Sequence, residues 1–299
     1  WNEDTMFPAH ATAANPAAAV FNGQLILVHR GYGASDQQLW WTTFDPDKGW
    51  SEDKRFDAHS SAAGPALAVY KGELHCVHRG ADNDTHLYHT KFTGSGWTRD
   101  QKLDAIKSSV GPALAVYDGL LHCVHRGDGP KTTMWHTTFN GSSWTADTEM
   151  PRHKTASNPA LAVYNNKLHL VHRGDGSNVH LWHATYTRFS GWTADTEMPR
   201  HSSLEGPGLA VFDNKLYCVH RGYGSSDQNL YWATYNGSWT QDTKFPAHSS
   251  GAGPAVVAYR DKNGTKDQLM VIHRGYGKRA AGTDTAETEA RIAAEESTG

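Results

Sequence analysis

Short apolar runs separated by polar turn residues recur along the whole chain. Residues 159–164 read Pro-Ala-Leu-Ala-Val-Tyr, and residues 168–172 form a second run that leads into an Arg-Gly pair. Apolar runs this short, bounded by turn residues, are typical of β-strands. Copies of the first run begin at Pro16, Pro65, Pro112, Pro207 and Pro254. The pattern therefore predicts an all-β chain built from repeats.

The tripeptide His-Arg-Gly marks the period of these repeats. It begins at His29, His78, His125, His172, His220 and His273, with spacings of 49, 47, 47, 48 and 53 residues. A period in the forties is typical of a four-stranded propeller blade, which buries its faces only by packing against its neighbours. Within a repeat, a third predicted strand covers residues 181–186 and a Gly-containing turn leads to an outer strand.

The outer strand begins at a recurring Trp that an Asp follows three residues later. These tryptophans are Trp1, Trp50, Trp97, Trp144, Trp192 and Trp239, and the aspartates are Asp4, Asp53, Asp100, Asp147, Asp195 and Asp242. Six outer strands match six inner runs. We predict an all-β, six-bladed β-propeller of four-stranded antiparallel blades, forming one domain over residues 1–299.

The two ends of the chain are predicted to close the ring. Residues 290–299 align with residues 230–238, which would pair the N-terminal outer strand with a C-terminal third strand and hide the open sheet edges. The alternative is a helical tail, because residues 287–296 are rich in Ala and Glu, which favour helix. The sequence leaves both interpretations open.

Charge and hydropathy exclude some partners. The formal net charge is -3, and there is no block of Lys and Arg and no apolar stretch near the ~18 residues of a membrane span. We therefore expect neither nucleic-acid binding nor a membrane span. The localisation stays open between secretion and the cytoplasm, and an oligomer is compatible with the sequence.

Cysteine and most histidine positions are predicted to be packing positions. Leu or Val replaces Cys76, Cys123 and Cys218 in other repeats, and aromatic or aliphatic residues replace His75, His122, His169, His89, His136 and His183. A metal ligand would not tolerate such exchange. The sequence predicts no disulfide, no metal and no cofactor.

A further histidine set is the first candidate for ligand binding. Each member follows the outer-strand Asp by six residues: His10, His59, His153, His201 and His248, with Ile106 in the remaining repeat. In an antiparallel blade, the loop that leaves the outer strand and the loop after the second strand emerge on the same face. We expect a ligand on that face; alternatively, these histidines order the loop backbone.

Arginine and aromatic side chains complete the candidate site. The tripeptide arginines Arg30, Arg79, Arg126, Arg173 and Arg221 either form repeated bidentate bridges to the outer-strand aspartates or donate to a ligand. The third-strand aromatics Trp40, Tyr88, Trp135, Trp182 and Tyr231 provide faces on which sugar rings pack, although their alternation also fits a buried strand.

Residues 77–89 (Val-His-Arg-Gly-Ala-Asp-Asn-Asp-Thr-His-Leu-Tyr-His) and the following Gly-Trp resemble the bacterial PLL-type propeller lectins and, more distantly, tectonin-like propellers. The pattern covers nearly the whole chain. It departs at Lys131 and Asn178, which replace Asp36, Asp84 and Asp227, and the last repeat lacks the Leu-Trp pair. The resemblance implies binding of sugars such as fucose between adjacent blades.

These observations favour a carbohydrate-binding protein with several similar sugar sites between blades and with glycans as partners. Two alternatives remain. One is a protein-interaction platform, because propellers commonly use one loop face for partners. The other is a glycan-processing enzyme with its site at the irregular last repeat, which has an insertion at residues 261–267 and carries Glu287, Glu289, Glu295 and Glu296. No catalytic residues are assigned.

Overall fold

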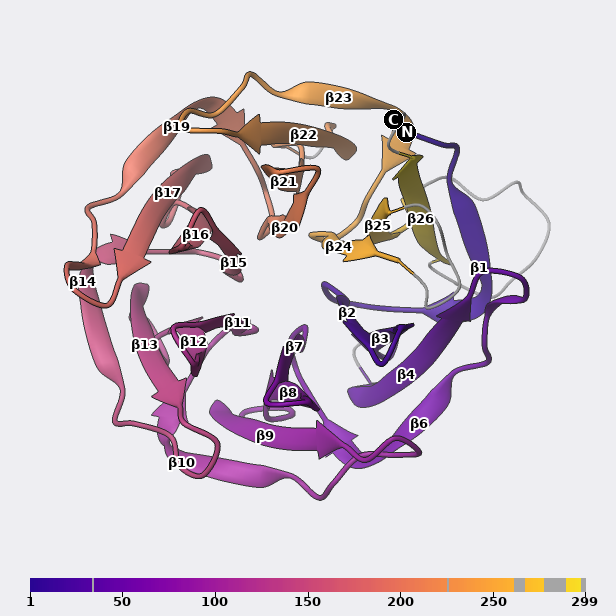
Figure 1. Ribbon diagram of the computed structural model, residues 1–299, viewed down its shortest axis with the longest axis horizontal. Helices are drawn as coiled ribbons and strands as arrows, with labels where there is room; N and C mark the ends of the chain where they lie inside the picture. Colours follow the sequence, from indigo (N-terminus) through magenta and orange to yellow (C-terminus); the bar gives the residue numbers. More distant parts are fainter. Residues whose placement is uncertain (34, 225, 261–266, 277–288, 297–299) are drawn as a thin grey trace.

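The computed structural model describes residues 1–33, 35–224, 226–260, 267–276 and 289–296. Within these residues the strands form six antiparallel sheets, which stand around a central axis like the blades of a propeller (Figure 1). The predicted all-β, six-bladed propeller is confirmed. No helix in the described part of the chain is long and apolar enough to cross a membrane.

Each blade has four main strands, counted outward from the axis, and blades 1 to 6 are numbered by their innermost strands. The innermost strands are β2 (Ala17–Phe21), β7 (Ala66–Tyr70), β11 (Ala113–Tyr117), β15 (Ala160–Tyr164), β20 (Gly208–Phe212) and β24 (Ala255–Tyr259). The second strands are β3 (Gln24–Arg30), β8 (Glu73–Arg79), β12 (Leu120–Arg126), β16 (Lys167–Arg173), β21 (Lys215–Arg221) and β25 (Gln268–Arg274). The third strands are β4 (Gln38–Asp45), β9 (His86–Phe92), β13 (Thr133–Phe139), β17 (His180–Thr187), β22 (Asn229–Tyr235) and β26 (Glu289–Glu296). The outer strands are β6 (Lys54–Ser60), β10 (Gln101–Lys107), β14 (Thr148–Lys154), β19 (Thr196–Ser202), β23 (Thr243–Ser249) and β1 (Thr5–Ala11).

The outer strands begin later than the sequence pattern indicated. The recurring Trp makes only a short pairing with the third strand, in the two-residue strands β5 (Gly49–Trp50) and β18 (Gly191–Trp192) or in an isolated bridge such as Phe92 to Trp97. The main outer strand starts just after the recurring Asp. The Trp segment was mistaken for the strand because its indole packs inward, as Trp97 does on Phe56 at 4.3 Å.

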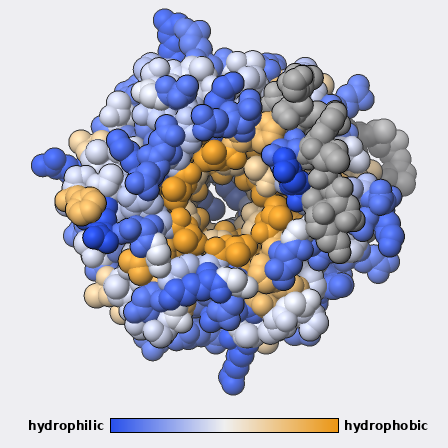
Figure 2. All heavy atoms as spheres, viewed as in Figure 1, coloured by the Kyte–Doolittle hydropathy of each residue, from blue (hydrophilic) through white to orange (hydrophobic). Residues whose placement is uncertain are grey.

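Crowding around the axis explains the small residues of the innermost strands. Figure 2 shows a ring of apolar residues around the central opening. At the turn before these strands the blades nearly touch: a Cβ added at Gly64 would lie 2.3 Å from the carbonyl oxygen of Asn15 in the preceding blade. Only glycine fits there. The Asn15 side chain in turn accepts a hydrogen bond from the backbone N–H of Gly253 in blade 6.

Blade 6 is completed by both ends of the chain. Strand β1 pairs antiparallel with β26, with Thr5 opposite Ile292, and β26 pairs with β25. The predicted closure is confirmed, and the alternative of a helical tail is wrong for residues 289–296. The helix-favouring composition is overridden because pairing on both sides satisfies the backbone of β26.

An aspartate shared by two histidines joins most neighbouring blades. Asp53 Oδ1 lies 3.0 Å from Nε2 of His29 in its own blade and 3.3 Å from Nε2 of His10 in blade 6. Equivalent pairs of contacts hold Asp100 (His78 and His59), Asp195 (His172 and His153), Asp242 (His220 and His201) and Asp4 (His273 and His248). We call this contact the His–Asp–His clamp.

The clamp corrects the predicted Arg–Asp bridge. Within the described residues, the recurring aspartates contact histidines, whereas the tripeptide arginines Arg30, Arg79 and Arg173 donate to backbone carbonyls. At the remaining junction, between blades 2 and 3, Ile106 replaces the outer histidine and packs in a core cluster with Leu103 and Leu121. Asp147 there contacts His125 at 3.1 Å.

Three blades carry stacked histidine pairs in their cores. His122 and His136 lie with ring planes 18° apart and their Nδ1 and Nε2 atoms 2.9 Å apart. Trp192 Nε1–H donates to His136 Nδ1, and His122 Nε2 lies 3.1 Å from the Tyr117 carbonyl oxygen. This chain of donors and acceptors is complete only when both imidazoles are neutral. The pairs His75–His89 and His169–His183 share the geometry.

Burial is the main reason that these rings stay neutral. Burial, followed by repulsion from the facing histidine of each pair, lowers the pKa of His89, His136 and His183 to about 3. The predicted packing role of these positions is confirmed, since all three pairs lie in the interior. Cys76, Cys123 and Cys218 are likewise buried and free.

The clamp leads to a prediction about stability. His59 in blade 1 and Ile106 in blade 2 occupy the same position of the repeat. The variant His59→Ile therefore gives the junction of blades 1 and 2 the residue that the junction of blades 2 and 3 has naturally. It removes a partner from Asp100 and from the Thr98 carbonyl, which lies 2.9 Å from His59 Nε2. We expect the free energy of unfolding in denaturant to fall by about 1–3 kcal/mol. The control is Asp57→Asn, an exposed change on the same strand; an equal fall for both variants would contradict the clamp.

The histidine pairs lead to a prediction about acid stability. Their folded pKa values lie below the unfolded value near 6.5, so the unfolded chain binds more protons and stability falls as the pH drops from about 6.5 toward 3–4. Each such histidine contributes a slope of at most about 1.4 kcal/mol per pH unit.

The variant His75→Tyr/His89→Trp introduces the stacked pair of blade 5, Tyr217 and Trp232. We expect it to flatten the dependence of unfolding free energy on pH in this window. His180→Gln, at an exposed position, should leave the slope unchanged. An unaltered slope in the double variant would rule out the pair as its source.

Candidate functional site

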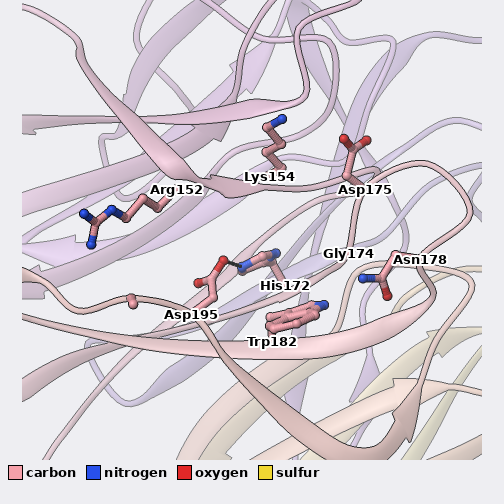
Figure 3. Close-up of a pocket in the computed structure, with 9 residues that line it drawn as sticks. Arg152, Lys154, His172, Gly174, Asp175, Asn178, Trp182 and Asp195 are labelled. Carbon is pink, nitrogen blue, oxygen red and sulfur yellow. Dashed lines mark ion pairs between the residues drawn. The ribbon is translucent and has the colours of Figure 1, made fainter.

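A pocket of about 400 Å³ lies between blades 3 and 4 (Figure 3). Its lining residues are Arg152, Lys154, His172, Gly174, Asp175, Asn178, Trp182, Ala194 and Asp195. Arg152 and Lys154 come from outer strand β14 of blade 3, whereas the other side chains come from blade 4. The pocket therefore exists only because two blades lie side by side.

Pairing between strands β16 and β17 sets the floor of this pocket. Trp182 lies opposite His172 in that pairing, and the His172 ring contacts Asp195 at 3.1 Å at the back of the pocket. Trp182 is partly exposed, so one part of its indole faces the open space. An indole face next to fixed polar groups suits the packing of a small ring-shaped ligand.

The loop after the Arg-Gly pair forms the rim. Asn178 Oδ1 accepts from the His180 backbone N–H at 3.1 Å, and the Asn178 N–H donates to the Asp175 carbonyl at 2.9 Å. A Cβ at Gly174 would lie 2.5 Å from Asn178 Cγ, so glycine lets the loop fold tightly against this side chain. The loop thereby holds both Asp175 and Asn178 at the pocket mouth.

A second pocket, of about 270 Å³, lies between blades 2 and 3. It is lined by Ala105, Lys107, Gly127, Asp128, Lys131, Trp135 and Asp147. Trp135 and Asp147 occupy the repeat positions of Trp182 and Asp195, and Lys131 occupies that of Asn178. The two pockets are therefore copies of one site on adjacent junctions.

Two other junctions have a different chemistry at the same positions. Tyr88 O–H donates to Asp84 Oδ2 at 2.6 Å, and Tyr231 O–H donates to Asp227 Oδ2 at 3.1 Å. Burial of Asp84 would raise its pKa, but hydrogen bonds from Tyr88 and His86 outweigh that effect and lower it. The bond to Asp84 raises the pKa of Tyr88 to about 12. The aromatic hydroxyl and the carboxylate thus satisfy each other.

The structure places the predicted aromatic set along the blade junctions. The five side chains Trp40, Tyr88, Trp135, Trp182 and Tyr231 are all partly exposed. Trp135 and Trp182 line the two pockets, and Tyr88 and Tyr231 form the pairs with aspartate. Binding of sugar by this set stays a prediction.

The predicted histidines are buried at the blade junctions, and His153 is the one that stands at a described pocket. His10, His59, His153, His201 and His248 are buried within the outer strands and contact the clamp aspartates. Register shifts in these strands, as between β17 and β19, interrupt the regular pairing beside the histidines. None of the five is among the lining residues of the two pockets, and their role toward a sugar stays a prediction.

The predicted arginines brace loops. Arg30 Nε donates to the Ser61 carbonyl at 3.0 Å, and its terminal nitrogen Nη2 donates to the Gly33 carbonyl at 3.0 Å. Arg79 and Arg173 make the same two kinds of contact. Arg126 and Arg221 occupy the same strand-end position. These contacts join the second strand to the loops around it, and donation to a ligand stays a prediction.

Sequence reasoning missed the cations of the pocket wall, Arg152, Lys154 and Lys107. Their signal is variation between repeats: the position of Lys154 holds Ser60 in blade 1 and Ser202 in blade 4. A search for repeated residues passes over such positions. No cluster of three or more His, Cys, Asp or Glu side chains in the described part of the chain has the arrangement of a metal site.

The region predicted for the enzyme alternative lies largely outside the described residues. These do not include residues 261–266 or Glu287, and of Glu289, Glu295 and Glu296 the structure describes only the backbone of β26. Asp267 pairs with Arg260 at the edge of the insertion.

Comparison with known proteins supports the fold through structure alone. No family model and no curated protein matches the chain. A protein of unknown function from Dyadobacter fermentans has a TM-score of 0.73 at 14% identity, with 99% of this chain and 98% of that chain covered.

Two fungal proteins are also similar in structure. AofleA from Arthrobotrys oligospora has a TM-score of 0.65 at 11% identity, covering 98% of this chain and 89% of its own. The Aleuria aurantia lectin, described as a six-bladed β-propeller with a novel mode of fucose recognition, has a TM-score of 0.63 at 13% identity, covering 89% and 88%. This chain is therefore similar in fold to six-bladed propellers that include a fucose-binding lectin.

Proposed function

We propose that this protein is a carbohydrate-binding protein whose sugar sites lie between adjacent blades. The observation that carries the proposal is the pocket between blades 3 and 4, in which a partly exposed Trp182 faces a rim of polar side chains. The C–H face of a pyranose packs on an indole, while its hydroxyls bond to fixed polar groups.

The repeated architecture supports the same proposal. The pocket between blades 2 and 3 copies the arrangement with Trp135, and a repeat protein can offer several such sites at once. A single shallow site binds weakly, whereas several sites on one molecule gain strength on a multivalent surface. The resemblance to bacterial PLL-type lectins and the fold similarity to a fucose-specific lectin make fucosylated glycans a first group to test.

The test is a glycan array followed by calorimetry on each saccharide that binds. Trp182→Ala and Trp135→Ala should each weaken binding at one site about tenfold, because the stacking surface is lost. The matched control is Phe189→Ala, which removes a 90% exposed aromatic ring from a turn at the opposite end of strand β17. An affinity and a number of sites that neither tryptophan change alters, or no glycan binding by the unaltered chain, would contradict the proposal.

A further inference from the structure

The two pockets differ from the other junctions in charge. One position of the outer strands, directly after the recurring histidine or Ile106, lines the pocket wall. It holds Lys107 and Lys154 at these two junctions, but Ala11, Ser60, Ser202 and Ser249 at the others. Each pocket has a second cation, Arg152 in one and Lys131 in the other. Each of these two junctions therefore has two pocket cations, whereas the junction of blades 4 and 5 has one wall cation, Arg200, at the position of Arg152.

These four cations have no partner among the described residues: neither an ion pair nor a side-chain hydrogen bond is formed by Arg152, Lys154, Lys107 or Lys131. All but Lys131 reach into the pocket from a neighbouring blade, and in Figure 3 Arg152 and Lys154 extend from β14 on the side of the pocket opposite Trp182. They are available for a ligand.

Three of the four carboxylates that line these pockets are already engaged, and the fourth, Asp128, follows Gly127 in the loop of the pocket between blades 2 and 3. Asp195 contacts His172 at 3.1 Å and His153 at 3.2 Å, and Asp147 contacts His125 at 3.1 Å. Asp175 accepts a hydrogen bond from Thr132 Oγ1 of the neighbouring blade at 2.8 Å. The lysines and the arginine are therefore the unsatisfied charges of the wall, and an anionic group of a ligand is their natural complement.

The junction of blades 1 and 2, which has a Tyr–Asp pair, lacks these cations. At the junction of blades 1 and 2 the wall positions are Ala58 and Ser60, and Asp84 with Tyr88 occupies the place of Asn178 with Trp182. A negatively charged ligand there would meet a carboxylate and no cation on the wall. Similar scaffolds around one ring thus offer two kinds of pocket.

We propose that the pockets between blades 2 and 3 and between blades 3 and 4 bind saccharide units that carry a carboxylate or sulfate group. The pyranose ring lies on Trp135 or Trp182, and the anionic group lies at Lys107 and Lys131 or at Lys154 and Arg152. This inference rests on the proposed function and narrows its ligand class at these two sites.

The experiment is titration calorimetry of the full chain with matched saccharide pairs: methyl glucuronide against methyl glucoside, and galactose 6-sulfate against galactose. We expect the acidic member of at least one pair to bind about tenfold or more tightly than its neutral partner, with two sites per chain. Its affinity should fall as sodium chloride is raised, while that of the neutral partner stays constant. The two pairs distinguish a carboxylate from a sulfate ligand.

Variants assign the sites. Lys154→Ser, which introduces the residue of blades 1, 4 and 5, should remove one acidic site, and Lys107→Ser/Lys154→Ser should remove both. The control is Lys167→Ser, the same change of charge at an exposed position at the start of β16, next to the turn from β15 at the other end of the blade. It should leave binding unchanged.

The outcomes separate this inference from the proposed function. Equal binding of acidic and neutral saccharides, or an equal loss in Lys167→Ser and Lys154→Ser, would overturn the inference while a sugar-binding function stands. No binding of any saccharide, fucosylated glycans included, would overturn the proposed function together with the inference.

Discussion

The rest of the structure depends on the carboxylate that two histidines of neighbouring blades share. Each blade supplies one histidine from its second strand and the aspartate before its outer strand, and at every junction but that of blades 2 and 3 the preceding blade supplies the other histidine, as with His29, Asp53 and His10. A buried charged group must be paired, so the contact fixes how closely and at what angle the blades meet. Pairing of β1 with β26 closes the ring with the same spacing, and the clamp at Asp4 completes it.

The pocket between blades 3 and 4 is built against one of these clamps. His172 and Asp195 form both the clamp and the back of the pocket between blades 3 and 4, so the distance between blades that the clamp sets is also the width of the pocket. Trp182 is held directly opposite His172 in the sheet, which places its indole next to the clamp. The part of the site that is common to all junctions is therefore structural, and only the rim and the outer wall are free to vary.

Sequence alone predicted the features that repeat. Blade count, strand order and the small residues at the axis follow from the period of His-Arg-Gly and from the recurring Trp, because each recurs with every blade. The closure occurs once, and the sequence left it open against a helical tail. The partner of the recurring Asp was wrong for a physical reason. Arginine is the usual bidentate partner of a carboxylate, but Arg30 turns to the Ser61 and Gly33 carbonyls, and the histidine that replaces it comes partly from another blade. When the repeats are aligned on one another, residues of two different repeats that contact each other are not recognisable as partners.

The pocket lysines escaped prediction for the opposite reason, since the residue at the position of Lys107 and Lys154 changes from blade to blade, and Arg152 recurs only as Arg200. Arg152 and Lys154 are exposed and contribute little to the packing that selects for periodicity, so substitutions there leave the ring intact. Residues 144–153 and residues 192–201 carry the same ten-residue sequence. The match stops at the next position, which is Lys154 in blade 3 and Ser202 in blade 4. Holding the blades together and binding a ligand therefore fall to different positions of the repeat. Residues buried at the junction must recur to close the ring. Residues one position further along the outer strand can change from blade to blade and so alter what each junction binds.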